Sequence, residues 1–181
     1  MSPVERCVTL RQWKDSDLEP YAALNADPEV MRFFPAPLTF AETSLSLARH
    51  RASIEKRGWG LWAVDVDGIF AGFTGLAEPK FKAHFTPCIE IGWRLRKEFW
   101  GQGIAFAAAQ QAMAYATSEL KLSELVSFTA AINLRSRRLM ERLGFSHDPR
   151  EDFDHPDIAE GHALRRHVLY RKRFVSLPSG P

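Results

Sequence analysis

The chain has 181 residues, a length that predicts one domain able to bury a core without disulfides or metal. Hydrophobic residues make up 45% and charged residues 25%, with a formal net charge of only +2, so composition favours an ordinary soluble globule and gives no argument for nucleic acid or an anionic membrane. The counts of 11 glycines and 11 prolines exclude collagen-like and low-complexity chains.

The two cysteines, Cys7 and Cys88, lie far apart in the sequence. This excludes a disulfide scaffold and a thiolate metal knuckle, and it favours a reducing cytoplasm. The N-terminus lacks a basic region followed by an apolar run, so we expect no secretory signal, and no apolar stretch reaches the ~18 residues of a membrane span. We expect a cytoplasmic protein without a membrane partner, with one domain over residues 1–181 and a core at about 6–173.

Apolar periodicity and turn residues predict the elements along the chain. Ser16 and Glu19 have capping-box spacing, and so have Thr39 and Glu42, which indicates where two helices begin. Asp67–Gly68 is a strong hairpin signal. The predicted elements are, in chain order, a strand at 6–11, a helix from 15 to 27, a helix from 39 to Gly58, strands at 60–66 and 69–76, a loop at 79–87, a strand at 88–95, a helix at about 103–120, a strand at 124–129, a helix from 133 to Gly144, a short strand near 145 and a last strand at about 164–173.

The order of these elements is mixed, without repeats or a linker. It predicts a single α+β domain with helices on both faces of a mixed sheet. The helix that follows Gly103 contains many alanines, which favour helix and allow it to lie close against a sheet.

The segment 89–105 is the one that indicates chemistry. It predicts a strand, a short loop with Gly101 and Gly103, and an immediate helix. Glycines let the backbone approach a ligand, and a helix N-terminus offers free N–H groups, so the pattern predicts an anion site, most simply for phosphate. A turn that needs glycine only for its backbone would give the same pattern. A dinucleotide fingerprint is excluded because position 106 is Phe, and the chain has no P-loop.

Trp100-Gly-Gln-Gly-Ile-Ala105 resembles the acetyl-CoA pyrophosphate loop of the GNAT N-acetyltransferases, usually written R/Q-x-x-G-x-G/A. Gly103 and Ala105 match, whereas Trp100 stands where Arg or Gln is more usual. That departure is typical of the branch of ribosomal-protein alanine N-acetyltransferases. The segment from Asn133 to Phe145 resembles the second signature of the same branch. The resemblance covers nearly the whole chain.

The resemblance implies a GNAT-like α+β fold: a mixed, mostly antiparallel sheet with helices on both faces and with its fourth and fifth strands splayed. It implies transfer of an acetyl group from acetyl-CoA, as co-substrate and without metal, directly to a primary amine, either a protein N-terminus or a small molecule. It also implies a homodimer. The alternative from another class is a non-catalytic acyl-CoA-binding module.

The same resemblance assigns cofactor-binding residues. Backbone amides would hold the pyrophosphate at Gly101, Gln102, Gly103, Ile104 and Ala105. The strand residues Trp93, Arg94 and Leu95 would pair with pantetheine where the two strands splay apart. Asn133 would bond the pantetheine arm, although Asn is also a preferred N-cap and could serve only as one.

Two residues are candidates for catalysis. Glu90 shares a strand face with Gly92 and would act as base for the amine, unless it is an ordinary solvent-facing or paired carboxylate. Many GNAT enzymes have a tyrosine acid seven residues after the motif asparagine, where this chain has Met140. In the branch it resembles, a serine three residues after that asparagine takes this part, here Ser136. The alternative for Ser136 is that it only satisfies a backbone group in the first helical turn.

Three further clusters lie outside these motifs. The acidic loop 148–160 contains or precedes several histidines without metal-ligand spacing, so we expect no metal there and attraction of a cationic acceptor instead. The basic end at 165–173 could suggest RNA, but alternation along a strand explains it, and we expect no nucleic-acid partner. Phe33–Phe34–Pro35 would line either the acceptor pocket or the core.

Overall fold

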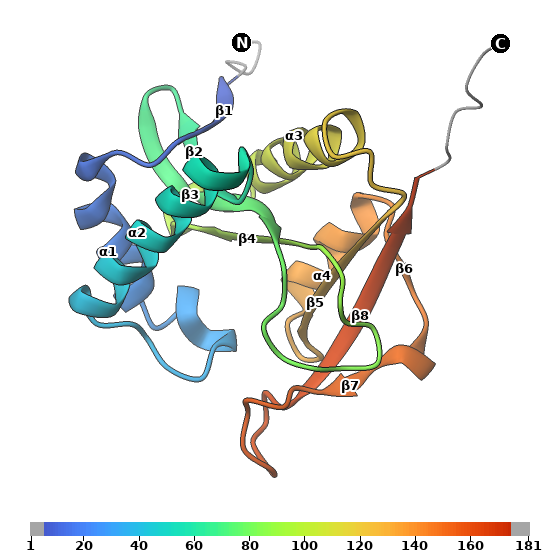
Figure 1. Cartoon of the computed structure of the whole chain (residues 1–181). Helices are drawn as coiled ribbons and strands as arrows, with labels where there is room; N and C mark the ends of the chain where they lie inside the picture. Colours follow the sequence, from blue (N-terminus) through green and yellow to red (C-terminus); the bar gives the residue numbers. More distant parts are fainter. Residues whose placement is uncertain (1–5, 175–181) are drawn as a thin grey trace, which may run out of the picture.

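The computed structural model describes residues 6–174 (Figure 1). Its helices are α1 (Leu18–Ala26), α2 (Phe40–Arg57), α3 (Ile104–Ser118) and α4 (Leu134–Arg142), with short 3-10 turns at Asp15–Asp17, Val30–Phe33, Lys97–Phe99 and Pro149–Glu151. Its strands are β1 (Val8–Arg11), β2 (Leu61–Val66), β3 (Ile69–Ala77), β4 (Glu90–Leu95), β5 (Glu124–Ala130), β6 (Ser146–His147), β7 (Phe153–Asp154) and β8 (Arg166–Arg173).

The strands form one mixed sheet in the order β1-β2-β3-β4-β5-β8-β6, with β7 also paired to β8. The pair β4–β5 is parallel, and the other pairs are antiparallel. β4 pairs with β3 along its whole length, but its parallel ladder with β5 contains only the bridge Glu90↔Val126. The predicted mixed, mostly antiparallel sheet with a splayed fourth and fifth strand is therefore confirmed.

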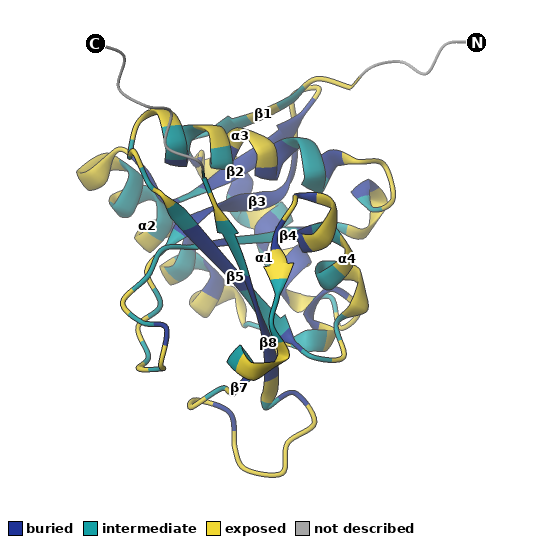
Figure 2. Cartoon of the chain, turned by 90° about the vertical axis from the view of Figure 1, so that its right-hand side faces the viewer, coloured by how far each residue is buried: buried dark blue, intermediate teal, exposed yellow. Residues whose placement is uncertain are grey.

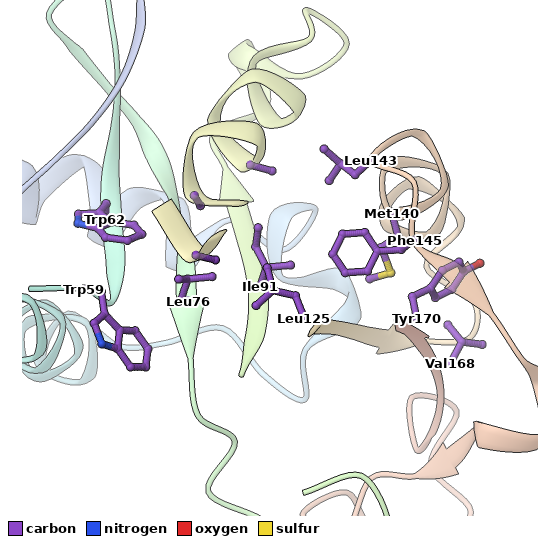
Figure 3. Packing of buried hydrophobic residues seen from close by; sticks show 13 residues of the cluster. Trp59, Trp62, Leu76, Ile91, Leu125, Met140, Leu143, Phe145, Val168 and Tyr170 are labelled. Carbon is purple, nitrogen blue, oxygen red and sulfur yellow. The ribbon is translucent and has the colours of Figure 1, made fainter. Parts of the chain in front are cut away.

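Helices cover both faces of this sheet, as predicted (Figure 1). α1 and α2 pack on one face of its N-terminal half, whereas α3 and α4 pack together on the other face. The alanines Ala108, Ala109, Ala112 and Ala116 of α3 are 0% exposed, so this helix does lie close against the strands. Figure 3 shows Ile91 and Leu125 at the centre of the main core cluster, between side chains of the two halves of the sheet.

Burial along β8 differs from the prediction. The predicted alternation puts Leu164, Arg166, Val168 and Tyr170 on one face, and of these Val168 and Tyr170 are buried against the α4 side. The opposite face is also buried, because Leu169 packs against Phe85 and Phe153 from the loop after β3 and from β7. β8 is thus an interior strand, whereas the loop 155–165 before it projects from the body and is largely exposed (Figure 2).

Two predicted capping boxes had different outcomes. At α2, Thr39 N–H donates to Glu42 Oε2 (2.8 Å) and Glu42 N–H donates to Thr39 Oγ1 (3.2 Å), which confirms the box. The box at Ser16 is wrong. The Asp17 carboxylate instead accepts bonds from two Arg11 nitrogens (2.7 and 2.9 Å), and a 3-10 turn precedes α1. This buried ion pair holds the chain in a tighter turn than a capped helix start.

The predicted hairpin is confirmed between β2 and β3. Asp67 and Gly68 have φ of 53° and 86°, the positive values that the turn requires. The remaining elements appear where the sequence placed them, with ends shifted by a few residues, and β7 is the strand that the sequence did not indicate.

Candidate functional site

The loop before α3 presents a row of free backbone donors. Gly101 and Gly103 have φ of 73° and 77°, and Gly103 is the N-cap of α3 without any side-chain cap. Within residues 6–174, the backbone N–H groups from Gly101 to Phe106 donate to no protein acceptor, the first bonded one being Ala107 N–H to Gly103 C=O (3.0 Å). A Cβ built on either glycine would meet no atom within 4 Å. The loop is thus an open anion-binding nest at the positive end of a helix.

Arginines of α4 add positive charge beside this loop. The guanidinium of Arg135 lies over the Trp100 ring at 3.9 Å, and that of Arg142 lies over the Phe106 ring at 5.0 Å. Neither these two nor Arg138 forms an ion pair in the described part of the chain. The sequence motif contained these arginines, but only the fold shows that two of them contact aromatic residues of the loop and of the first turn of α3. Together with the free amides they suit a polyanionic ligand.

The gap between β4 and β5 begins directly after their single bridge. Val126 N–H donates to the C=O of Ile89 (3.1 Å), and Ser127 Oγ donates to the C=O of Ile91 (2.9 Å). Beyond these bonds β5 pairs only with β8 on its other side. Ser127 is 2% exposed, so it closes the narrow end of the gap from inside the sheet.

The three residues predicted to meet pantetheine do not face the gap equally. Backbone polar groups alternate along a strand, so Trp93 and Leu95 turn theirs toward β5, in line with Ile91. The C=O of Leu95 accepts a bond from Trp100 Nε1 (2.9 Å), which ties the loop to the strand. Arg94 turns its backbone toward β3, where it pairs with Phe73, and extends its side chain to α1.

Glu90 lies at the closed end of the gap, on the β4 face that Gly92 and Arg94 share. Its side chain forms no hydrogen bond or ion pair with residues 6–174, yet its carboxylate oxygens are not fully shielded from solvent. Burial raises the pKa of Glu90 to about 7. Glu90 is thus not a paired carboxylate in this structure. A carboxyl that exchanges a proton near neutral pH is suited to general-base chemistry.

Cys88 is the other reactive group near Glu90. Burial, and next the nearby charge of Glu90, raise the pKa of its thiol to about 11. Because the thiolate and not the thiol is the nucleophile, Cys88 is protonated and unreactive at neutral pH. This arrangement favours direct transfer over a covalent acyl-cysteine.

Asn133 and Ser136 open α4. Asn133 Oδ1 accepts a bond from Ser136 N–H (3.3 Å), which makes Asn133 the N-cap, and its amide donates to Thr129 Oγ1 (2.9 Å). The capping role that we weighed for Asn133 is therefore present, with one amide N–H left over. Ser136 Oγ is half-buried and bonds no group in the described residues, so its hydroxyl is available to a ligand.

The charged loops are more neutral than their sequences indicated. Three carboxylates of the 148–160 loop form ion pairs with arginines, namely Asp148 with Arg150 (2.6 Å), Glu151 with Arg171 (2.6 Å) and Asp154 with Arg166 (3.4 Å), and Asp152 is hydrogen-bonded to His147 (2.7 Å). These ion pairs join part of the acidic loop to part of the basic end. They reduce the negative charge that the loop would present to a cationic acceptor. Over residues 6–174, no group of three His, Cys, Asp or Glu side chains is placed to hold a metal ion.

The aromatic residues after α1 divide between two environments. Phe33 packs against the buried Ala130, Ile158 and Leu164, as in a core. Phe34 is 38% exposed and lies over the guanidinium of Arg94 at 4.0 Å. Phe34 therefore borders the β4 face that carries Glu90.

Comparison with known proteins gives consistent matches. The family model described as "Acetyltransferase (GNAT) domain" matches residues 8–146. The FsC-acetyl coenzyme A-N(2)-transacetylase of Aspergillus fumigatus is 31% identical over 165 residues, covering 85% of this chain and 69% of that protein. The putative ribosomal N-acetyltransferase YdaF of Bacillus subtilis is 34% identical over 114 residues, covering 60% of this chain and 62% of that protein. The crystal structure of an acetyltransferase from Agrobacterium tumefaciens superimposes with a TM-score of 0.74 at 26% identity, covering 95% of this chain and 93% of that one.

Proposed function

The chain belongs to the GNAT acetyltransferase family, and we propose that it transfers an acetyl group from acetyl-CoA to a primary amine by direct attack. The proposal rests on one observation: the β4–β5 gap connects an anion site with a carboxyl group. The row of free N–H groups from Gly101 to Phe106 lies at the open end of this gap, and Glu90 lies at its closed end. An elongated molecule with an anionic part and a reactive end fits that path.

The residues present fit acetyl-CoA as co-substrate. The amides of Gly101, Gln102, Gly103, Ile104 and Ala105 would hold the pyrophosphate, with Arg135 and Arg142 nearby. The gap-facing backbone of Trp93 and Leu95, and the spare amide N–H of Asn133, would meet the pantetheine arm. Acetyl-CoA would supply the activated acyl group.

Glu90 has the properties of the base. An amine must be uncharged to attack, and a free α-amine has a pKa of about 7.7–8 and a lysine amine about 10.4. Burial holds the pKa of Glu90 at about 7, so above that pH its carboxylate can accept the proton of the incoming ammonium or of the attacking amine. The N–C bond then forms as the C–S bond breaks.

The departing thiolate needs little help. Its conjugate thiol has a pKa of about 8.5, so the thiolate is a good leaving group that needs little more than a hydrogen-bond donor. Ser136, three residues after Asn133 on α4, has an unbonded hydroxyl that can donate to the sulfur and relay a proton to it. Ser136 regains its proton from solvent and Glu90 releases its proton to solvent, so the net change is one proton moved from the amine nitrogen to the CoA sulfur.

The proposal is tested by CoA release against a panel of primary amines, together with calorimetry of acetyl-CoA binding. Binding with turnover of at least one amine, detected as an acetylated product, supports it. Binding without turnover of any amine would instead favour the non-catalytic acyl-CoA-binding module. Absence of binding would refute both.

Further properties complete the proposal. The YdaF match, named as a putative ribosomal N-acetyltransferase, supports a ribosomal acceptor, while the Aspergillus match, named as an FsC-acetyl coenzyme A-N(2)-transacetylase, supports transfer to a nitrogen atom of another acceptor. We propose a cytoplasmic location because both cysteines are unpaired. Within residues 6–174, no helix is both long and apolar enough to span a bilayer. The expectation about a secretory signal falls partly on residues outside the described ones. The single domain over 1–181, the homodimer, and the lack of metal, membrane and nucleic-acid partners stay predictions.

A further inference from the structure

Arg94 projects from β4 into a pocket of aromatic and polar side chains. Its Nη1 donates to Asn25 Oδ1 on α1 at 2.6 Å. Its guanidinium carbon lies over the Phe34 ring at 4.0 Å and over the Phe73 ring at 5.2 Å. Burial lowers the pKa of Arg94 to about 10, so the group remains a cation at neutral pH.

This cation has no anionic partner in the described part of the chain. Other shielded arginines do have one, since Arg11 binds Asp17 (2.7 Å) and Arg171 binds Glu151 (2.6 Å). The titratable groups facing Arg94 are the Tyr21 phenol and the His50 imidazole. Burial, with the charges of Arg49 and Arg94, lowers the pKa of His50 to about 4, so His50 is neutral there. A half-buried guanidinium without a carboxylate is an unusual and unfavourable arrangement.

The unused hydrogen-bonding edge of Arg94 is defined. Nε is shielded from solvent and bonds nothing within residues 6–174, and Nη2 likewise has no partner but is not fully shielded. The aromatic rings lie over the face of the guanidinium, and Asn25 occupies Nη1. Nη2 is therefore the nitrogen that a ligand carboxylate can reach, through a charge-assisted hydrogen bond.

The position of Arg94 connects this edge with the reacting end of the site. Arg94, Gly92 and Glu90 lie on one face of β4, and a Cβ at Gly92 would meet no atom within 4 Å. The floor between the base and the arginine is therefore open. Glu90 and Arg94 are four residues apart along the strand, so their Cα atoms are about 13 Å apart. Both side chains extend from the strand, so a ligand that joins their ends spans a shorter distance.

Resting on the proposed acetyl transfer, we propose that Arg94 binds a carboxylate of the acceptor, so that the substrate is an amine that also bears a carboxylate several bonds away. Glu90 then receives the amine end and Nη2 of Arg94 receives the carboxylate end. Arg94 acts here in substrate recognition and takes no part in the proton transfers.

The test uses pairs of acceptors that differ only in the carboxylate, such as 6-aminohexanoate against 6-aminohexanamide, and the same pair one and two carbons shorter. Binding is measured by calorimetry on the full chain saturated with CoA, and turnover is measured by CoA release with acetyl-CoA. We expect at least one acid to bind at least tenfold more tightly than its amide, and to show a correspondingly lower KM, because a charge-assisted hydrogen bond is lost with the amide.

Arg94→Gln should abolish this preference, and Arg94→Lys should retain only part of it, because lysine keeps the charge without the fork. Arg49→Gln removes the same charge from an exposed position on α2 and should leave the preference intact. Melting curves and acetyl-CoA affinity show whether each variant is folded. Should Arg94→Gln unfold, the acid and amide pairs on the wild type still decide the question.

The outcomes separate this inference from the proposed function. Equal binding of every acid and its amide, or a preference that survives in folded Arg94→Gln, overturns the carboxylate assignment and leaves acetyl transfer standing. An Arg94-dependent preference in binding without CoA release from any amine supports the carboxylate site and overturns the enzymatic proposal.

Discussion

Replacing Glu90 with glutamine should make the protein more stable at alkaline pH while it makes the enzyme slower. Burial raises the pKa of this carboxyl from 4.5 to about 7, so the fold disfavours its charged form. Below pH 4.5 the carboxyl is neutral in both the folded and the unfolded chain, and no penalty exists. As pH rises toward 7 the unfolded chain ionises first, so stability is lost over this window, and above it the folded protein carries the full penalty.

The size of the effect follows from the two pKa values. Their difference, at about 1.36 kcal/mol per pKa unit, corresponds to about 3 kcal/mol. Solvent reaches the carboxylate oxygens and screens part of this energy, so we expect a gain of about 1–2 kcal/mol for Glu90→Gln at pH 8. For a chain of this length that is a rise in Tm of about 2–8 °C. At pH 5 the gain should be much smaller, because most folded molecules keep Glu90 protonated.

Thermal melts of wild type and Glu90→Gln at pH 5 and pH 8 measure this difference, with Glu160→Gln in the exposed 155–165 loop as the matched control. In the same samples kcat should fall by about 10²–10⁴, and wild-type activity should rise with pH through about 7. If the stability gain of Glu90→Gln does not depend on pH, the burial argument is wrong. If kcat is unchanged, Glu90 is not the base.

Three further predictions concern the cofactor side of the site. Gly103→Asp should weaken acetyl-CoA binding at least tenfold, because it adds a negative charge to the anion nest at a φ of 77°. The control Gly161→Asp, at a φ of 79° in equally open space, should not weaken it. Calorimetry measures both affinities, and equal affinities would remove the nest assignment. Ser136→Ala should lower turnover about 10–100-fold with little change in acetyl-CoA affinity; full turnover would refute the acid role, and a pure affinity loss would reassign Ser136 to binding. Arg135→Gln combined with Arg142→Gln should weaken acetyl-CoA binding about tenfold and flatten its dependence on salt, and an unchanged salt dependence would exclude both from phosphate binding.

The sequence predicted features that depend on residues close together in the chain. The Thr39–Glu42 box and the Asp67–Gly68 turn formed because their partners lie within three residues of each other. At Ser16 another local contact formed instead, since Lys14 N–H donates to Asp17 Oδ2 (2.8 Å) across the 3-10 turn. Arg11 on β1 adds an ion pair to the same carboxylate, and that contact depends on how β1 and the turn are placed.

The candidate site divides in the same way. The glycine loop and the start of α4 are continuous in sequence, so their motifs could be recognised. The partners of Arg94 could not, because Asn25 lies 69 residues away and Phe34 comes from the segment before α2. The pairing of acidic with basic loops escaped prediction for the same reason, since Glu151 and Arg171 are 20 residues apart and meet only through the order of the strands. Charge counts along the chain therefore overstated the acidity of this surface.

The closed end of the β4–β5 gap determines how its two walls are aligned. One backbone bridge and the hydroxyl of Ser127, bonded to the C=O of Ile91 at 2.9 Å, fix the point from which the two strands diverge. Glu90 belongs to that bridge, so the direction in which its carboxyl points is fixed by the same contacts. In the proposed reaction, the orientation of Glu90 toward the thioester would consequently depend on a buried serine that forms no hydrogen bond with Glu90. The arrangement of the groups proposed to react would therefore depend on contacts inside the sheet.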